Sequence, residues 1–594
     1  MNYTPPLRDI RFALAEIAGF PTVAALPGYE EATPDLVDSI LLEAANIAAN
    51  TLAPLNRTGD KTGSKLVDGK VVTPDGWNEA WRTLVDGGWN GVSCSPEFGG
   101  MGLPHVLELA VSEMWQSANL AFALCPMLTQ GAVNAVALYG SDRQKALYLP
   151  NMVSGNWTGT MNLTEPQAGS DLAAVRTRAV PSGNNGYMLS GQKIFITYGD
   201  HDLTDNIIHL VLARLPDAPA GVKGISLFIV PKHRIDEAGN ITGPNDVTCA
   251  SLEHKMGIHG SPTAVLVFGE KGGAWGELIG EPNRGLEYMF AMMNHARLNV
   301  GLQGLSIAER AYQQARDFAR ERIQGQPLGY TGPGTGPIVH HPDVRRMLLS
   351  MKSRIEAMRG LLYEVAAASD IAHHATDSAI QAYHQRKVDV LTPIAKGWCT
   401  ETGIEIASLG MQVHGGMGYI EETGAAQHLR DARITTIYEG TTGIQANDLV
   451  GRKLIRDKGA AMAELLASID ATVASLQGAT PELAALGQAL AAANADAKSA
   501  TAALLTRSND PRMPFAAAVP YLNQMGILTG ADVLARGALA AHTHAQSGDA
   551  DGYYASKLAL AQFYTAHVLP QAAAFAHTVR DGSPTVFALA ETHL

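Results

Sequence analysis

The chain has 594 residues, of which 46% are hydrophobic and 17% are charged. This length exceeds what one hydrophobic core supports, so several domains are expected, and the composition excludes a disordered chain. The net charge of −13 disfavours nucleic acid or an anionic membrane as a partner, because neither is attracted by a negative field. An anionic small ligand can still bind through local cationic side chains and backbone N–H groups.

Export and membrane insertion are not indicated by the sequence. The first nine residues mix prolines with charges, whereas a secretory signal places a basic tip before an apolar core. The most apolar stretches, residues 118–138 and 485–505, are interrupted by polar residues or proline before reaching the roughly 20 apolar residues that span a bilayer. A cytoplasmic protein without a membrane span is therefore predicted. Four widely spaced cysteines are interpreted as core residues of a reducing compartment: Cys94, Cys125, Cys249 and Cys399.

Two kinds of periodicity follow one another in the first half of the chain. Between residues 34 and 151 apolar residues recur three and four positions apart, which predicts helices separated by Gly- and Pro-rich loops. Between residues 157 and 280 short runs of Val, Ile, Thr and Phe predict a compact antiparallel sheet or barrel. The expected strands are residues 157–163, 186–197, 207–214, 225–231, 247–256 and 263–268.

Helical spacing returns after residue 283, and a loop rich in Gly and Pro covers residues 325–342. After residue 459 Ala and Leu dominate, which favours a further bundle because Ala has the strongest helix propensity. The expected helices are residues 285–322, 343–374, 378–409, 438–457, 460–476, 481–506 and 553–578.

These patterns predict an α+β chain in which a β domain lies between helical ones. The expected parts are an N-terminal extension (1–33), a helical N-terminal domain (34–156), a central antiparallel β domain (157–282), a helical domain (283–457) and an additional C-terminal helical domain (458–594).

Six short strings fall where a flavin and a thioester of coenzyme A would need them, and their order resembles that of the acyl-CoA dehydrogenase family. The resemblance covers residues 34–452. The strings are residues 163–171 (LTEPQAGSD), 191–197 (GQKIFIT), 255–257 (KMG), 320–322 (RER), 412–419 (QVHGGMGY) and 438–441 (YEGT).

The resemblance implies FAD as the cofactor and the family's order of helical, β and helical domains. It implies that Met161, Leu163 and Thr164 touch the isoalloxazine ring and that Ser170 bonds the FAD pyrophosphate or CoA. The second flavin-edge position is occupied by Phe195, Ile196 and Thr197, with Phe where Trp is frequent.

The same resemblance assigns residues to the rest of FAD. Arg322 matches an arginine that reaches the pyrophosphate of the neighbouring subunit, and a fixed donor fork suits phosphate. Gln412, Gly415 and Gly416 match contacts to the adenosine side, which implies a homodimer. A glutamine common in the family is replaced here by Gly443, so backbone from Thr441 to Gly443 is expected to substitute.

Glu439 matches the family's catalytic base, which removes the α-proton of the thioester. Some branches carry this glutamate immediately before the arginine that is Arg297 here, but this chain has Ala296 there. The resemblance therefore implies that the base comes from elsewhere, and Glu439 fits the other location known in the family. Burial that raises its pKa would make a carboxylate strong enough for this proton, and Tyr438 and Ile437 are expected to form its apolar walls.

The implied substrate contacts are less regular. Asn294 stands where several members have an Asp that contacts CoA, and Arg452 is displaced by one position from a family arginine. The implied substrate-binding residues are Ser170, Asn294, Arg297, Tyr438, Gly440 and Arg452.

No metal site is predicted. Two adjacent histidines occur twice, as His340–His341 and His373–His374. Within each pair the two side chains would point about 100° apart on a helix, and no third ligand follows at i+4.

Residues 3–12 and the additional C-terminal domain resemble a bacterial branch of the family. One member of that branch oxidises 3-methylmercaptopropionyl-CoA in dimethylsulfoniopropionate breakdown. Other members act on medium- or long-chain fatty acyl-CoA. The resemblance implies electron-transferring flavoprotein as electron acceptor. An acyl-CoA oxidase, which passes electrons to oxygen, and a catalytically silent scaffold remain the alternatives.

Overall fold

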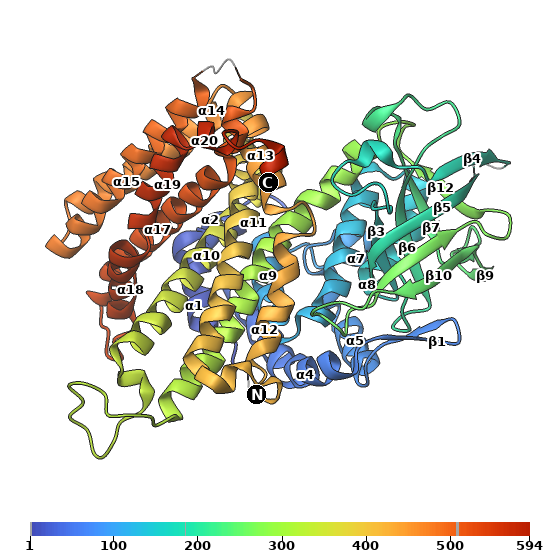
Figure 1. The fold of residues 1–594 in the computed structure, drawn as a ribbon. Helices are drawn as coiled ribbons and strands as arrows, with labels where there is room; N and C mark the ends of the chain where they lie inside the picture. The colour runs from blue at the N-terminus through green and yellow to red at the C-terminus, as the bar shows by residue number, and fades with distance from the viewer. Residues whose placement is uncertain (1–2, 184–185, 507–509) are drawn as a thin grey trace. The chain divides into compact units, whose positions relative to one another are not determined.

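The computed structural model describes residues 3–183, 186–506 and 510–594. The chain divides into two compact units (Figure 1). The β unit contains Glu43–Leu103 and Ala118–Ala296. The helical unit contains Tyr3–Leu42, Pro104–Ser117 and Arg297–Leu594.

An eight-stranded sheet forms the centre of the β unit (Figure 1). Its strand order is β10-β11-β5-β12-β7-β6-β3, and β4 pairs with β5. All pairings are antiparallel except that of β3 with β6, which is parallel. The strands are β3 (Trp157–Asn162), β4 (Arg178–Ser182), β5 (Gly186–Thr197), β6 (Asn206–Ala213), β7 (Ser226–Pro231), β10 (Val247–Leu252), β11 (Thr263–Phe268) and β12 (Ala274–Ile279).

The long strand β5 organises this sheet. Its last residues pair with β11, with Thr197 opposite Thr263, and its first residues pair with β12 and β4. Apolar side chains from these strands form a buried core that includes Leu189, Ile196 and Phe228. Six of the eight strands match the expected runs, and β4 and β12 were not expected.

Helices and two hairpins complete the β unit. Helix α7 lies against β3, where the backbone N–H of Gly159 donates to Thr129 Oγ1 at 3.1 Å. The further elements are α4 (Ala53–Thr62), α5 (Trp77–Asp86), α7 (Leu120–Tyr139), α8 (Asp142–Ser154), β1 (Lys65–Val67) with β2 (Lys70–Val72), and β8 (His233–Ile235) with β9 (Ile241–Pro244).

Long helices form the helical unit (Figure 1). Helix α9 (Gly285–Glu321) begins in the β unit and continues in the helical unit from Arg297. The other helices are α1 (Leu7–Phe12), α2 (Phe20–Ala24), α3 (Pro34–Ile47), α6 (His105–Ala118), α10 (Pro342–His374), α11 (Ser378–His414), α12 (Ala425–Ala432), α13 (Thr442–Asn447), α14 (Ala460–Gln477), α15 (Pro481–Leu505), α16 (Met513–Ala516), α17 (Ala518–Ala545), α18 (Tyr553–His567), α19 (Pro570–Asp581) and α20 (Ser583–Val586).

Two helix predictions are wrong in their bounds. The helix expected over residues 438–457 begins only at Thr442 and continues as a π-helix, η11 (Asp448–Ile455), because Glu439 and Gly440 adopt positive φ angles. The helix expected over residues 553–578 is divided into α18 and α19. Pro570 starts α19 because its missing N–H fits a helix N-terminus but not a helix interior.

Two described segments are long and apolar enough to cross a bilayer by length and composition alone: Pro34–Thr62 and Leu120–Tyr139. The expectation that residues 118–138 are interrupted too early for this is therefore wrong. In Leu120–Tyr139, however, 89% of the most apolar window is buried inside the protein. All four cysteines are free and buried, as expected of core residues.

Candidate active site

The two strings expected at the flavin edge meet in the β unit. The backbone N–H of Ile194 in β5 donates to the carbonyl of Thr164, at 2.9 Å, in the segment that follows β3. The ammonium group of Lys193 donates to the carbonyl of Leu163 at 3.0 Å. Hydrogen bonds thus hold the segment after β3 against strand β5, about 30 residues further along the chain.

A buried ion pair supports this junction. Lys193 is fully buried, and its Nζ lies 2.8 Å from Oε1 of Glu165, which is itself 3% exposed. Glu165 also accepts the backbone N–H groups of Arg176, at 2.7 Å, and Thr177, at 3.1 Å. Burial alone would raise the pKa of Glu165, but the Lys193 charge and these hydrogen bonds hold it at about 2.

The predicted flavin-edge side chains differ in accessibility. Phe195 is 59% exposed and has a φ of +60°, a conformation that a bulky residue rarely adopts and that concentrates at functional sites. Met161, Thr164 and Thr197 are partly buried, Ser170 is exposed, and Leu163 is buried. Ile196 belongs to the buried core of the sheet and is only 2% exposed, and its predicted contact with the flavin stays a prediction.

The residues predicted to bind the far end of FAD lie in the helical unit. The rings of Phe318, in α9, and His414, in α11, contact each other with centroids 4.5 Å apart and planes tilted by 31°, which places the C-terminal ends of these helices side by side. Arg322, just after α9, and Gln412, Gly415 and Gly416, at the end of α11, are all exposed. The structure thus brings these four residues to one end of the helical unit.

Glu439 occupies a tight turn of the helical unit, between Ile437 and α13. The φ angles of Glu439 and Gly440 are +54° and +87°, so the chain passes through two consecutive left-handed residues. The side-chain amide of Gln445 donates to the carbonyls of both residues, at 3.1 and 3.3 Å. Thr441 then caps α13 by accepting the backbone N–H of Ile444 at 3.3 Å.

Two cations act on the Glu439 carboxyl group. Burial raises the pKa of Glu439 to about 7, and the positive charges of Arg297 and Lys396 limit this rise. The side chain keeps partial solvent access. A carboxylate with this pKa ionises near neutral pH and is then a stronger base than an ordinary glutamate.

Arg297 belongs to a buried chain of charges. Its Nη1 lies 3.4 Å from Oδ2 of Asp448, and Nε of Arg452 lies 2.6 Å from the other carboxylate oxygen. Arg297 and Asp448 are buried, whereas Arg452 and Asn294 are exposed. Asp448 therefore orients one buried arginine beside the base and one exposed arginine.

The two residues expected to form walls around Glu439 differ in accessibility. Tyr438 is partly buried, and its hydroxyl donates to the side-chain carbonyl of Gln303. Ile437 is 47% exposed, and its role as an apolar wall stays a prediction. Gly443 lies in α13, three residues from the left-handed Gly440.

Family models match most of the chain in order. The N-terminal, middle and C-terminal domains of acyl-CoA dehydrogenase match residues 39–156, 160–270 and 283–455. A further model, described as acetyl-CoA dehydrogenase C-terminal like, matches residues 465–590. The 3-methylmercaptopropionyl-CoA dehydrogenase of Ruegeria pomeroyi is 47% identical over 587 residues, 98% of each chain. This chain belongs to the acyl-CoA dehydrogenase family.

Two other relatives extend this comparison. The broad-specificity linear acyl-CoA dehydrogenase of Mycobacterium tuberculosis is 34% identical over 590 residues, 96% of each chain. The acyl-CoA dehydrogenase of Bacillus anthracis complexed with FAD is 18% identical, with a TM-score of 0.74 over 96% of this chain and 91% of that chain. The fold, the enzyme class and the additional C-terminal domain predicted from the sequence are confirmed.

Sequence reasoning missed three of the side chains that surround this acyl-CoA dehydrogenase's candidate base. They are Lys396, Gln303 and Asp448, which lie 43 residues before, 136 before and 9 after Glu439 in the chain. Lys396 had a usable signal, because it interrupts an apolar helical run between Ile394 and Trp398, both of which are buried. Gln303 and Asp448 carried no such signal.

Proposed function

We propose that this chain oxidises an acyl-CoA thioester to the trans-2-enoyl-CoA, with FAD as cofactor and Glu439 as the base that removes the α-proton. The observation that carries this proposal is the Glu439 carboxyl group, whose pKa of about 7 results from burial tempered by Arg297 and Lys396. An ordinary surface glutamate is too weak a base for this proton.

The neighbouring residues prepare Glu439 for proton transfer. The turn held by Gln445 fixes the backbone of the base, and the backbone N–H of Glu439 is the donor expected to hold the thioester carbonyl. Arg297, oriented by Asp448, supplies a buried positive charge toward the anionic substrate. As the α-proton moves to Glu439, the carboxylate becomes neutral and the enolate charge is carried by these donors.

The residues present fit FAD. A Cβ added at Gly169, Gly415 or Gly416 would meet no described atom within 4 Å, so backbone there is open to close approach. Ser170 and Arg322 expose a hydroxyl and a guanidinium group suited to phosphate. When bound, the flavin supplies the acceptor for the β-hydrogen, which leaves as hydride while the Cα–Cβ double bond forms.

The proposed substrate is 3-methylmercaptopropionyl-CoA, on the strength of the full-length relative in R. pomeroyi. Its sulfur is attached to the β-carbon, where a lone pair stabilises the positive charge that develops as hydride leaves. The alternative is a linear fatty acyl-CoA, and the relative in M. tuberculosis favours it.

An acyl-CoA panel separates these substrates. Pentanoyl-CoA is the matched control, because it replaces the thioether sulfur with a methylene. We expect a higher kcat/KM for 3-methylmercaptopropionyl-CoA than for pentanoyl-CoA, with octanoyl-CoA below both. A tenfold preference for octanoyl-CoA would favour the fatty acyl-CoA alternative.

We also propose a cytoplasmic homodimer that passes its electrons to electron-transferring flavoprotein. The exposed Arg322 and Gln412 support the dimer, because both match contacts to FAD that cross between subunits in the family. Rapid formation of one peroxide per turnover would instead indicate an oxidase. A purified chain without flavin absorbance would favour the silent scaffold.

Glu439→Gln tests the proposed base. We expect the variant to retain FAD and to bleach the oxidised flavin at least about 10²-fold more slowly on adding substrate, which is the usual contribution of a general base. Glu79→Gln is the control, because Glu79 is an exposed glutamate of α5. Retention of more than a tenth of the rate in Glu439→Gln, at control-like FAD content, would place the base elsewhere.

A further inference from the structure

We infer that Lys396 is a positioning residue for the base: its ammonium group holds the Gly440 carbonyl and thereby fixes the left-handed turn that directs the Glu439 carboxylate. This inference rests on the proposed function of Glu439. It adds a side chain from α11 to the machinery of proton abstraction.

The contact that carries the inference is short and buried. Lys396 lies inside α11 with no exposed surface, and its Nζ donates to the Gly440 carbonyl at 2.7 Å. The same carbonyl accepts a longer hydrogen bond from Gln445, at 3.3 Å. Gly440 is therefore held from α11 on one side and from α13 on the other.

The turn requires such a restraint. A left-handed conformation at a residue other than glycine is unfavourable and persists only where the surroundings determine it. Glu439 has this conformation, and its side chain direction depends on it. If the Gly440 carbonyl were released, Glu439 could relax to an ordinary φ angle and turn its carboxylate away.

The positive charge of Lys396 has a second effect. A neutral donor would hold the carbonyl at a lower desolvation cost, so a buried ammonium group needs a further reason. That reason is the nearby Glu439 carboxylate, whose ionised form the ammonium stabilises. Burial lowers the pKa of Lys396 to about 8, the charges of Glu439 and Glu401 oppose this fall, and that of Arg297 adds to it.

The hydrogen bond and the charge act at different moments. Before proton transfer the ammonium favours the ionised base. After Glu439 takes the proton, its charge disappears, but the Gly440 carbonyl still accepts from Lys396, so the turn keeps its shape through the reaction. Residues 439 and 440 thus need no rearrangement during proton transfer.

Three substitutions separate these effects. Lys396→Met removes both the donor and the charge, Lys396→Gln keeps a donor without charge, and Lys396→Arg keeps both. Lys387→Met is the matched control, because Lys387 is a lysine of the same helix that pairs with Glu364 at 2.6 Å. The readouts are FAD content, the rate of flavin reduction in a single turnover from pH 5.5 to 9.5, and the isotope effect of α-deuterated substrate.

We expect Lys396→Met to keep its FAD and to reduce flavin about 10- to 100-fold more slowly, as displaced catalytic groups do. The acid limb of its pH profile should move to higher pH, because the loss of a positive charge raises the pKa of Glu439. Lys396→Gln should recover part of the rate without restoring the limb, and Lys396→Arg should restore both. The isotope effect should increase in Lys396→Met.

Three other outcomes would overturn the inference. In the first, Glu439→Gln is inactive but Lys396→Met matches Lys387→Met in rate and pH profile, so Glu439 remains the base and Lys396 has no positioning role. In the second, Lys396→Met is slow with an unmoved acid limb and Lys396→Arg does not restore the rate, which also excludes the positioning role. In the third, Glu439→Gln stays active, and the proposed function fails together with this inference.

Discussion

At the scale of single residues, the raised pKa that suits Glu439 to proton abstraction also lowers the stability of the folded protein. Burial raises the pKa of Glu439 from its ordinary value of 4.5 to about 7 in the folded protein. Between these pH values the folded state binds more protons than the unfolded state. The free energy of unfolding therefore falls as pH rises through this window, and the penalty is complete above pH 7.

Glu439→Gln should remove this penalty. We expect the variant to unfold at a higher temperature than the wild type at pH 8, and we expect the difference to shrink toward pH 5. The measurement is a series of thermal or urea unfolding curves across this range. Glu79→Gln is the control, because Glu79 is an exposed glutamate of α5, and its difference from wild type should stay small across this range. Parallel stability curves for Glu439→Gln and wild type would contradict the raised pKa.

The sequence could identify Glu439 but not the residues that tune it. The string around Glu439 is contiguous, so it is recognisable without a fold. The approach of Lys396 depends on how α11 packs against α13, and the position of Asp448 between two arginines depends on the π-helix η11. Such partners are brought together by tertiary packing, which cannot be read from the spacing of residues along the chain.

At the scale of elements, the sequence predicted the helices and strands that have a regular apolar periodicity. It did not predict the places where a local backbone conformation interrupts an element. Strands β5 and β11 have the bounds expected of them, because runs of β-branched and aromatic residues are long enough there. Strand β12 was missed because its six residues follow a Gly-rich turn and include a glycine. The helix expected at 438–457 was wrong at the turn formed by Glu439 and Gly440, where positive φ angles prevent a helix.

Also at the scale of elements, the ion pair between Lys193 of β5 and Glu165, in the segment after β3, supports the predicted flavin-edge strings. Lys193 and Glu165 are both buried, and breaking such a pair costs about 3–5 kcal/mol because one charge remains uncompensated. Lys193 also fixes the Leu163 carbonyl. Its loss should therefore loosen the segment that begins the predicted flavin contact.

Lys193→Met should lower both the stability and the FAD content of the purified protein. The checks are urea unfolding and the ratio of flavin to protein absorbance. Lys271→Met is the control, because Lys271 is an exposed lysine of the same unit. Adding Glu165→Gln to Lys193→Met should recover part of the stability, since no carboxylate is then left without its counter-charge. A Lys193→Met protein with full FAD content would show that this ion pair does not support the flavin edge.

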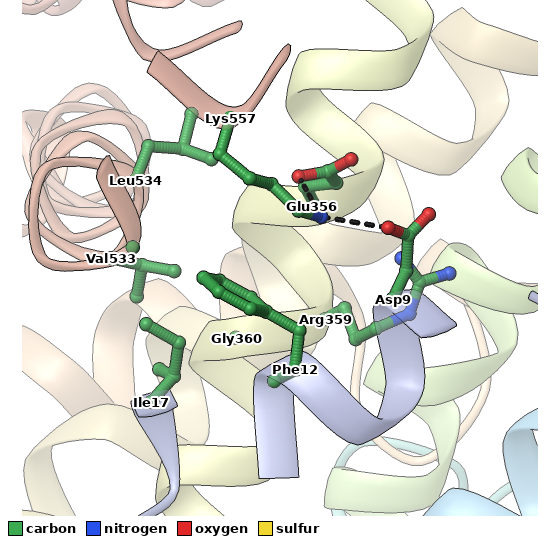
Figure 2. A pocket seen from close by; sticks show the side chains of 11 residues that line it. Asp9, Phe12, Ile17, Glu356, Arg359, Gly360, Val533, Leu534 and Lys557 are labelled. Carbon is green, nitrogen blue, oxygen red and sulfur yellow. Dashed lines mark hydrogen bonds and ion pairs between the residues drawn. The ribbon is translucent and has the colours of Figure 1, made fainter. Parts of the chain in front are cut away.

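At the scale of the whole chain, the first residues pack against the additional C-terminal helices within the helical unit. Phe12 and Ile17 line a cavity of about 30 Å³ together with Val533 of α17 (Figure 2). The carboxylate of Asp9 lies 2.7 Å from Nζ of Lys557, in α18. The N-terminal extension and the C-terminal domain, both features of the same family branch, are therefore in direct contact.

The charges at this junction are balanced. Asp9 and Glu356 each pair with both Lys352 and Lys557, at distances of 2.6–3.0 Å, and all four are largely buried (Figure 2 shows the two bonds of Lys557). Burial opposes ionisation of Asp9, but Lys352 and Lys557 outweigh it and hold its pKa below the ordinary value of 3.8. The stability from Asp9 is therefore present above that pH and is lost as pH falls.

Asp9→Asn should leave two buried ammonium groups with one carboxylate and destabilise the helical unit by about 3 kcal/mol, because a buried charge loses its partner. The measurement is urea unfolding at pH 7, and the stability difference should decrease as the pH is lowered toward that at which Asp9 itself becomes protonated. Asp551→Asn is a closely matched control, since Asp551 also pairs with a residue of α1, Arg8, but both side chains are at least half exposed. It should cost clearly less than Asp9→Asn, because an exposed ion pair contributes little to stability.

A double-mutant cycle separates this coupling from a general loss of packing. Asp9→Asn combined with Lys557→Met should cost clearly less than the sum of the two single substitutions, because the second removes a charge that the first left uncompensated. Additive costs would show that the two residues stabilise the chain independently. The first residues would then pack beside α18 without fastening it, and their removal should leave the unfolding of the C-terminal helices unchanged.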